Sequence, residues 1–233
     1  MTELSVLVPY KPDQGPRDEI FRWISAFYRK YMPFAEICLG HSKSQLFSRA
    51  QAINDAASKA KTDCFLIADN DLIYDPDQIL KAKAMLAGHP WIIPYSKVHN
   101  IQEDSTKKLL RTEPVWPLGR PVRTVVRAQG THGGLTLIPR KHFEAVNGFD
   151  ERFVGWGGED DAFAYSVDTI CGRHRRLEAE IYHLWHPNDK TGGNPNYQNN
   201  FELCMRYFRA RGHVGAMKQL ISSRSRTGRD GGT

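Results

Sequence analysis

Apolar residues in the first 95 positions alternate between short continuous runs and longer segments with a helical repeat. The short runs, which are typical of buried strands, lie at 4–9, 35–39, 64–68 and 91–94. The longer segments repeat their apolar residues every three or four positions and lie at 18–31, at 44–60 and from Pro76 onward. Strands that alternate with helices predict an α/β fold, in which helices flank a mainly parallel sheet.

The pattern changes after residue 95. The segment 96–130 is polar and has no clear period, so we expect a long excursion over the surface there. Regular structure is expected to resume as a strand at 133–139, a short helix at 140–146, a helix at 159–171, a strand at 177–184 and a terminal helix from about Phe201. The Gly- and Asn-rich segment 187–199 indicates a loop.

The composition is that of an ordinary soluble domain, with 40% hydrophobic and 25% charged residues among 233. The chain contains no run of about 18 apolar residues, so no membrane span is expected. Its N-terminal residues lack the basic start and long apolar stretch of a signal peptide. The four cysteines lie far apart, which favours free thiols in the cytoplasm: Cys38, Cys64, Cys171 and Cys204.

The net charge is +6, and much of the positive charge follows residue 205. A C-terminal helix and a basic, flexible tail are therefore predicted over 213–233. Such a tail is usually solvated, so nucleic acid is not an expected partner, whereas basic charge elsewhere suits a phosphorylated ligand. The sequence does not indicate an oligomeric state.

Asp69, Asn70 and Asp71 directly follow the apolar run 64–68. In extended backbone, residues two apart point the same way, so both carboxylates can reach one place. Carboxylate oxygens suit Mn²⁺ or Mg²⁺, which bind them together with substrate phosphates. Taken alone, such a triplet is more often a turn with a capping aspartate. Its position favours a site, because ligands of α/β sheets bind at the carboxyl ends of strands.

Two histidines, His183 and His186, lie at the end of the predicted strand 177–184. Their imidazoles could supply a further metal ligand. The alternative is a pair of ordinary histidines, one buried and one at the rim. Taken alone, the pair fits this alternative better. The ligand hypothesis gains because a metal held by aspartates needs another protein ligand and because this pair ends a strand.

The segment GWGGEDD, residues 155–161, places Trp156 among glycines and then adds Glu159, Asp160 and Asp161. The glycines free the backbone for positive φ or for movement, so the indole can cover a ligand or stack on a sugar. The carboxylates begin a predicted helix, whose dipole favours negative charge at that end. The helix dipole thus offers an explanation for the three carboxylates that gives them no catalytic role.

Taken in order, four segments of the chain resemble the nucleotide-sugar glycosyltransferases of GT-A fold. The likeness is greatest to the β-1,4-galactosyltransferase family and extends distantly to the polypeptide N-acetylgalactosaminyltransferases. It spans about 5–187 and rests on VPYK (8–11), FSRAQAIN (47–54), IADNDLI (67–73) and GGLTLIPRKHFEAVNGFDERFVGWGGEDD (133–161). The last segment carries the most weight, because a short DxD motif is common by chance and this long run is not.

The resemblance implies a nucleotide site and a metal site. Phe47 and Arg49 are expected to hold the uracil and phosphate end of a UDP-sugar. The other residues implied for the nucleotide sugar are Pro9, Tyr10, Lys11, Asp69, Asn70, Gly134 and Trp156. Asp71 is the expected ligand of Mn²⁺ or Mg²⁺, with His183, His186 and Asp69 as further candidates.

It also implies a reaction, the transfer of a hexose or N-acetylhexosamine from a UDP-sugar to an acceptor hydroxyl with inversion. Asp160 and Glu159 are the expected catalytic residues, with Asp160 as the base that takes the hydroxyl proton. Trp156, Glu159 and Asp161 are expected to bind the acceptor. Trp156 and the loop 187–199 would act as lids that close over the bound donor.

The chain departs from the family at Thr131-His132, where the family has an aromatic pair. The donor sugar therefore stays open, and so does the acceptor, which is a glycan, a protein or a lipid. The chain shows neither the membrane anchor nor the disulfides of the Golgi members, so a cytoplasmic enzyme of a bacterium or bacteriophage is expected. One domain is expected over 1–212, with its nucleotide and metal half at about 1–95 and its acceptor and lid half at about 96–212.

Two alternatives remain on the sequence alone. One is a retaining transferase of the polypeptide N-acetylgalactosaminyltransferase type, although those enzymes have Asn where Asp160 stands. The other is a non-catalytic module that binds carbohydrate or nucleic acid.

Overall fold

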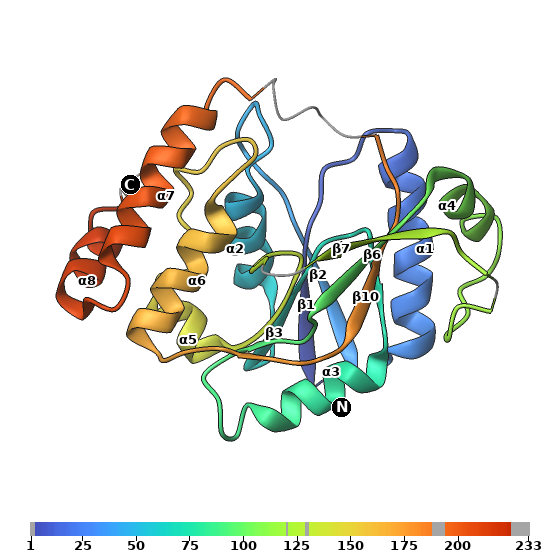
Figure 1. The fold of residues 1–233 in the computed structure, drawn as a ribbon, viewed down its shortest axis with the longest axis horizontal. Helices are drawn as coiled ribbons and strands as arrows, with labels where there is room; N and C mark the ends of the chain where they lie inside the picture. The colour runs from blue at the N-terminus through green and yellow to red at the C-terminus, as the bar shows by residue number, and fades with distance from the viewer. Residues whose placement is uncertain (1–2, 120, 129–130, 188–193, 225–233) are drawn as a thin grey trace, which may run out of the picture.

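The computed structural model describes residues 3–119, 121–128, 131–187 and 194–224, which share one continuous hydrophobic core. A six-stranded sheet has the order β2-β1-β3-β8-β5-β9, and a four-stranded sheet has the order β4-β10-β6-β7. In the larger sheet β8 alone runs against the other strands. The predicted α/β fold, with a mixed and mainly parallel sheet flanked by helices in a single domain, is confirmed (Figure 1).

The larger sheet consists of β1 (Leu4–Pro9), β2 (Ala35–Gly40), β3 (Cys64–Ala68), β5 (Ile92–Ile93), β8 (Leu135–Pro139) and β9 (Arg175–Arg176). The smaller sheet consists of β4 (Leu72–Tyr74), β6 (Lys97–Ile101), β7 (Thr124–Ala128) and β10 (Glu180–His183). The helices are α1 (Pro16–Tyr31), α2 (Arg49–Lys59), α3 (Pro76–Met85), α4 (Glu103–Leu109), α5 (Arg140–Ala145), α6 (Glu159–Ile170), α7 (Tyr197–Ala210) and α8 (Val214–Ser222).

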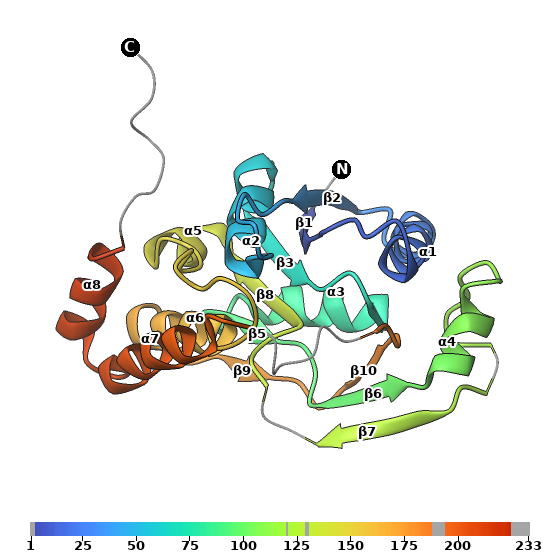
Figure 2. The same cartoon turned by 90° about the horizontal axis from the view of Figure 1, so that it is seen from above.

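The helices form groups around the sheets. Helix α2 packs on β1 and β2, while α6, α7 and α8 pack on one another at one end of the molecule. Helices α1 and α4 lie at the opposite end (Figure 1). Seen from above, β6 and β7 lie together along one edge, next to α4 (Figure 2).

The apolar run 91–94 was expected to close the parallel run of the sheet. Strand β5 does point in the same direction as β3, but it pairs with β8 and β9 instead. Strand β8, from far along the chain, lies between β3 and β5 and pairs antiparallel with both. Four of the five β8 residues are buried, so the strand covers the edge that β3 would otherwise expose.

The helix predicted over 44–60 begins later, at Arg49. Ser48 is its N-cap and accepts a hydrogen bond from the backbone N–H of Gln51. Gln51 in turn uses its Oε1 to accept from the backbone N–H groups of Lys43 (3.0 Å) and Ser44 (3.2 Å). These side-chain bonds hold the preceding segment as a loop, against its apolar pattern.

The prediction of an irregular excursion over 96–130 is wrong for much of that segment. It contains β6, α4 and β7, and β6 pairs with β10 as well as with β7. Val125 and Val126 of β7 are exposed, so β7 lacks the buried apolar face that reveals a strand in a sequence. Its backbone pairing with β6 stabilises it instead.

The remaining element boundaries differ modestly. Strand β10 covers only the last part of the run 177–184, and α7 begins at Tyr197 instead of near Phe201. All four cysteines are free thiols, as predicted. The predicted tail over 213–233 contains α8, and residues 225–233 lie outside the described residues.

Arg224, at the end of the described chain, is only 9% exposed. Its guanidinium donates to the backbone oxygens of Val146 (2.8 Å) and Gly148 (2.9 Å) and to the hydroxyl of Tyr207 (2.9 Å). The Tyr207 hydroxyl donates to Asp150 Oδ2 at 2.7 Å. The C-terminal helices are thereby tied to the loop that leads into the GWGGEDD segment.

We expect Arg224→Met to lower the free energy of unfolding by about 3 kcal/mol, because buried carbonyl groups and Asp150 lose their positively charged partner. Urea denaturation measures this loss. Arg209→Met is the matched control, since Arg209 is an exposed arginine of α7. A loss below about 0.5 kcal/mol in Arg224→Met, the range of ordinary surface changes, would contradict this anchoring role.

Candidate functional site

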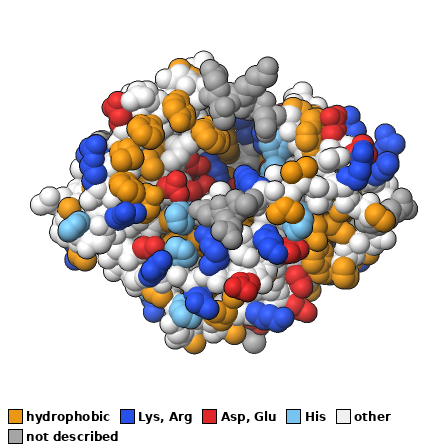
Figure 3. Space-filling model, in the orientation of Figure 1, with side chains coloured by type: hydrophobic (Ala, Val, Ile, Leu, Met, Phe, Trp, Pro, Cys, Tyr) orange, Lys and Arg blue, Asp and Glu red, His pale blue; other side chains and the backbone are white. Residues whose placement is uncertain are grey.

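The polar segments singled out in the sequence meet on one face of the molecule. Asp69 and Asp71 lie in the turn that joins β3 to β4, and His183 ends β10. The N-terminus of α6 carries Glu159 and Asp160. Figure 3 shows a hollow in the middle of this face, with acidic and histidine side chains at its border.

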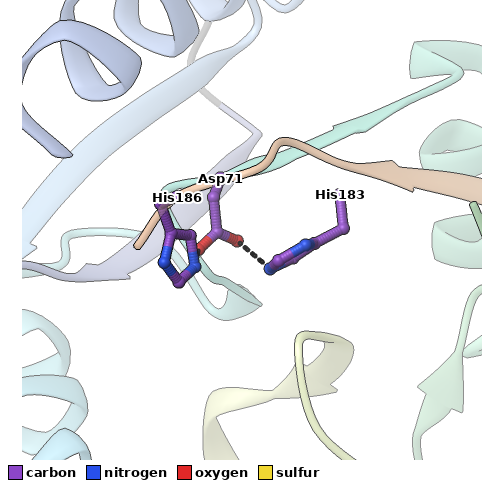
Figure 4. Close-up of side chains that lie close together, drawn as sticks. All are labelled: Asp71, His183 and His186. Carbon is purple, nitrogen blue, oxygen red and sulfur yellow. Dashed lines mark ion pairs between the residues drawn. The ribbon is translucent and has the colours of Figure 1, made fainter. Parts of the chain in front are cut away.

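The pairing of β4 with β10 assembles the candidate metal ligands. Leu72 lies opposite His183 in this antiparallel pair, and the N–H of Leu184 donates to the backbone oxygen of Asp71 at 2.8 Å. The Asp71 side chain therefore lies between the imidazoles of His183 and His186 (Figure 4). One ligand atom from each of the three residues lies within 4.8 Å of the other two.

Distances within this triad leave one carboxylate oxygen without a hydrogen bond. His186 Nε2 lies 3.2 Å from Asp71 Oδ2, and His183 Nε2 lies 3.6 Å from Asp71 Oδ1. Asp71 is 6% exposed, and its Oδ1 has no hydrogen-bond partner among the described residues. An unpartnered buried carboxylate oxygen is costly unless a ligand satisfies it.

The ionisation of the triad follows from burial and charge. Burial alone would raise the pKa of Asp71, but the neighbouring His183 and the hydrogen bond with His186 bring it below its ordinary value. Burial lowers the pKa of His183, which favours the neutral imidazole that binds metals. One buried carboxylate with two imidazoles fits a divalent first-row transition ion better than Mg²⁺, which prefers oxygen ligands throughout.

Asp69, also predicted as a metal ligand, lies outside this triad. Its Oδ1 accepts a hydrogen bond from Arg49 Nε at 2.7 Å. Burial raises the pKa of Asp69 in spite of the neighbouring Arg49. The structure therefore pairs the first aspartate of the DND turn with an arginine and leaves the second for the histidines.

Arg49 joins the two acidic segments of the site. Its Nη1 is hydrogen-bonded to Asp160 Oδ1 and lies 3.8 Å from Glu159 Oε1. Burial acts to lower the pKa of Arg49, but the charges of Asp160, Asp69 and Glu159 raise it above its ordinary value. The sequence marked Arg49 for the nucleotide and gave no signal that it would link Asp69 to Asp160.

The two carboxylates that begin α6 lie in different surroundings. The Glu159 side chain is 12% exposed and that of Asp160 is 28% exposed. Burial and the neighbouring charge of Asp160 raise the pKa of Glu159. A Cβ atom at Gly133 would lie 1.9 Å from Asp160 Oδ2, so the segment that leads into β8 lies close to this carboxylate because residue 133 has no side chain.

Asp161 has a partner that was not predicted as a site residue. His132 Nδ1 lies 2.6 Å from Asp161 Oδ1. The sequence marked Thr131-His132 only as a departure from the family pattern. The hydroxyl of Tyr95 donates to the backbone oxygen of Gly133, the residue that follows His132.

Trp156 is 59% exposed and lies on a loop of glycines. Gly155, Gly157 and Gly158 have φ values of 76°, 115° and 89°, which L-residues with a side chain rarely adopt. The indole lies nearly parallel to the ring of Tyr197, with centroids 6.2 Å apart. Of the predicted lid loop 187–199, residues 188–193 lie outside the described residues.

The predicted nucleotide wall lies at the carboxyl end of β1. Pro9 is buried there, and Tyr10 stacks on Phe21 with centroids 4.3 Å apart. Lys11 follows as an exposed residue, and Phe47 is partly buried. The backbone oxygen of Phe47 accepts from Gly155 at 3.0 Å, so this segment contacts the tryptophan loop directly.

Two further residues predicted to bind the nucleotide sugar adjoin Asp69. Asn70 is buried between the two aspartates of the turn. Gly134 has a φ of 85°, and its backbone oxygen accepts from Asp69 N at 2.9 Å.

The sequence is similar to known galactosyltransferases. Residues 120–189 match a family model described as the N-terminal domain of galactosyltransferase. Human beta-1,4-galactosyltransferase 4 is 25% identical over 174 residues, which is 72% of this chain and 43% of the relative. Mouse beta-1,4-galactosyltransferase 7 is 30% identical over 87 residues, which is 37% of this chain and 23% of the relative. The chain thus spans less than half the length of these two relatives.

Comparisons of the structure extend over nearly the whole chain. GalNAc-T7, solved with UDP, GalNAc and Mn²⁺, superposes with a TM-score of 0.53 at 11% sequence identity. The superposition covers 94% of this chain and 54% of the GalNAc-T7 chain. Glucosyl-3-phosphoglycerate synthase from Mycobacterium tuberculosis has a TM-score of 0.51 at 12% identity and covers 91% of this chain and 80% of its own. The chain has the GT-A fold.

The GT-A fold places the hollow of Figure 3 where the carboxyl ends of the strands meet, which is where ligands of α/β sheets bind. The sequence relatives and the fold neighbours are all glycosyltransferases. Among the described helices, none is both long and apolar enough to cross a membrane.

Proposed function

We propose that the chain transfers a hexose or N-acetylhexosamine from a UDP-sugar to an acceptor hydroxyl, in a Mn²⁺-dependent reaction that inverts the anomeric carbon. The observation that carries this proposal is the triad of Asp71, His183 and His186, whose central carboxylate leaves a buried oxygen unpartnered. The fold neighbours GalNAc-T7, solved with Mn²⁺ and UDP, and glucosyl-3-phosphoglycerate synthase, solved with Mn²⁺ and UDP-glucose, support the same choice of ion and nucleotide.

In this proposal Asp71, His183 and His186 hold the Mn²⁺ ion. When bound, such an ion neutralises the charge that develops on a leaving diphosphate. The nucleotide then lies along the carboxyl ends of β1 and β3. The residues that we assign to the nucleotide sugar are Pro9, Tyr10, Lys11, Phe47, Arg49, Asp69, Asn70 and Gly134.

Asp160 is our candidate for the base that takes the acceptor proton. Its side chain is more exposed than that of Glu159, so an acceptor hydroxyl can reach it. Its Oδ1 is hydrogen-bonded to Arg49 Nη1, which holds the carboxylate in place at the start of α6. One direct displacement assisted by this carboxylate inverts the anomeric carbon, whereas a retaining transferase would keep the donor configuration, and NMR of the product distinguishes the two.

The acceptor side of the site is assigned to Trp156, Glu159 and Asp161. Trp156 is exposed on a loop with three positive-φ glycines, so its indole can cover a sugar and exclude water from it. Glu159, with its raised pKa, and Asp161 both lie in the first turn of α6 beside Asp160. Carboxylates in that position can accept hydrogen bonds from acceptor hydroxyls.

We expect UDP and Mn²⁺ together to raise the midpoint of thermal unfolding by about 5–10 °C at a concentration of a hundred times Kd, because a ligand that binds only the folded state stabilises it. Either component alone should give a smaller shift, since the ion joins the diphosphate to the triad. The same samples are then assayed for UDP release from UDP-galactose, UDP-N-acetylgalactosamine, UDP-glucose and UDP-N-acetylglucosamine. Absence of both the thermal shift and UDP release with all four donors would refute the proposal.

A further inference from the structure

A second pocket lies away from the triad and is lined entirely by basic residues. It has a volume of about 510 Å³, and its lining residues are His89, Arg173, His174, Arg175 and Arg176. Four of these five are consecutive in the sequence, between α6 and the end of β9. No role in donor binding or proton transfer accounts for this concentration of positive charge.

The backbone holds this segment in place. Gly172 has a φ of 110°, and a Cβ atom there would lie 2.9 Å from Pro90 Cγ, so the turn packs tightly against the residue after His89. The N–H of Arg175 then donates to the backbone oxygen of Trp91 at 3.1 Å. The pairing of β9 with β5 thus sets the four basic residues beside His89.

The charges in this pocket are poorly neutralised. Within the described residues, no ion pair joins Arg173, Arg175 or Arg176 to a carboxylate. Arg176 instead donates to two backbone oxygens, those of Tyr95 (3.1 Å) and Thr131 (2.9 Å). Only His174 has an acidic partner, Asp168, at 3.1 Å.

A short path of side chains joins this pocket to the acceptor side of the site. The ring of His174 lies 5.6 Å from that of His132, centroid to centroid. His132 contacts Asp161, which is next to Asp160 in α6. Figure 3 shows Lys, Arg and His side chains gathered near the acidic border of the hollow on the same face.

We propose that this pocket binds an anionic group of the acceptor, a phosphate, sulfate or carboxylate carried by a sugar near the attacked hydroxyl. The inference rests on the proposed transferase function, and it names an anionic glycan as the acceptor class. Arginine guanidinium groups bind such oxyanions through paired hydrogen bonds. A glycan that extends from Asp160 past Asp161 and His132 brings its charged substituent to the arginines.

The shape of the site favours a glycan over nucleic acid. A protein that binds single-stranded nucleic acid combines basic residues with exposed aromatic rings on which bases stack. The tryptophan next to this pocket, Trp91, is fully buried, and its Nε1 donates to Asp168 at 2.8 Å. The basic residues form a compact pocket, so they suit a single charged group.

The test uses a double variant of two exposed pocket residues, Arg173→Gln with Arg175→Gln. A matched control removes the same charge from α7, Arg206→Gln with Arg209→Gln, where both arginines are exposed. The probes are a heparin tetrasaccharide, which carries sulfate and carboxylate, and neutral chitotetraose. Calorimetry at low salt measures the Kd of each probe for the wild type and both variants, because salt screens exposed charges.

We expect the heparin tetrasaccharide to bind the pocket variant about tenfold more weakly than the wild type and the control variant less than twofold more weakly. Chitotetraose should not distinguish the three proteins. An unchanged tetrasaccharide affinity in the pocket variant, or an equal loss in the control variant, would overturn the proposal. Loss of affinity for a 12-nucleotide single-stranded DNA or for anionic vesicles, without loss for the tetrasaccharide, would also overturn it.

The thermal shift with UDP and Mn²⁺ is measured on the same three proteins. It is expected to be equal in all of them, because the pocket lies outside the donor site. If the wild type shows neither this shift nor UDP release from any donor, the proposed transferase function fails, and a pocket-dependent loss of tetrasaccharide binding still establishes the anion site. If the shift is present and the tetrasaccharide affinity is unchanged in the pocket variant, the anionic acceptor is wrong and the transferase proposal stands.

Discussion

Asp71→Asn is expected to lower the rate of sugar transfer by about a thousandfold or more, with the fold retained. Asp71 is the only carboxylate of the triad and lies between the two imidazoles. An asparagine has nearly the same shape but no negative charge, so affinity for a divalent ion falls. The loss corresponds to about 4 kcal/mol of transition-state stabilisation, which is typical of what a catalytic metal supplies.

The fold should survive this substitution because the structural bond at residue 71 is made by its backbone. The Asp71 carbonyl accepts from Leu184 N at 2.8 Å, and this bond does not involve the side chain. The buried Oδ1 has no hydrogen-bond partner among the described residues, so an amide at this position breaks no hydrogen bond of that oxygen. We therefore expect the unfolding midpoint without metal to stay within a few degrees of that of the wild type.

Three measurements check this prediction: initial rates of UDP release, Mn²⁺ affinity by electron paramagnetic resonance and the midpoint of thermal unfolding. Asp77→Asn is the matched control, an exposed aspartate in the first turn of α3. Its rate should stay near that of the wild type. A rate for Asp71→Asn within tenfold of the wild type would show that the triad does not hold the catalytic ion.

Asp160→Asn is expected to lower kcat by about a thousandfold, in the middle of the range for loss of a general base. The amide cannot take the acceptor proton. Donor binding should persist, because the metal triad is untouched and Arg49 remains paired with Asp69 at 2.7 Å. The thermal shift with UDP and Mn²⁺ is therefore expected to equal that of the wild type.

Glu159→Gln is the variant to compare with Asp160→Asn, because it changes the neighbouring carboxylate. The two carboxylates are adjacent in the first turn of α6, and Glu159 is the more buried. We expect Glu159→Gln to raise KM for the acceptor about tenfold and to change kcat less, because we assign it to acceptor binding. If kcat falls further in Glu159→Gln than in Asp160→Asn, Glu159 is the base, a role that its raised pKa also suits.

Local periodicity predicted most of the fold correctly. The apolar runs 4–9, 35–39 and 64–68 became β1, β2 and β3, and the carboxylates at 159–161 begin α6. These elements were predictable because each shows its burial in its own sequence, as a short apolar run in a strand or as apolar residues every three or four positions in a helix. Strand β7 was missed, because pairing with β6 stabilises it while both its valines stay exposed.

The residues of the candidate site could be nominated from the sequence, but the contacts between them could not. The sequence nominated Asp71 with His183 and His186, and the structure brings these three together. It also nominated Asp69 as a ligand and Arg49 for the nucleotide, whereas the structure pairs them with each other. The type of a residue and its place at a strand end indicate that its side chain can bind a ligand. They do not specify which other side chain it contacts.

The sequence by itself determined which segments form helices and strands, their order, and which polar side chains lie at the strand ends. Only the tertiary structure decided that β8 separates β3 from β5, and that β4 and β10 pair with Leu72 opposite His183. It alone also set Arg49 between two acidic segments and four consecutive basic residues beside His89. The physical reason is that the apolar pattern of a segment shows only that this segment is buried. Contacts between distant segments depend on how all the buried faces of the fold pack against one another.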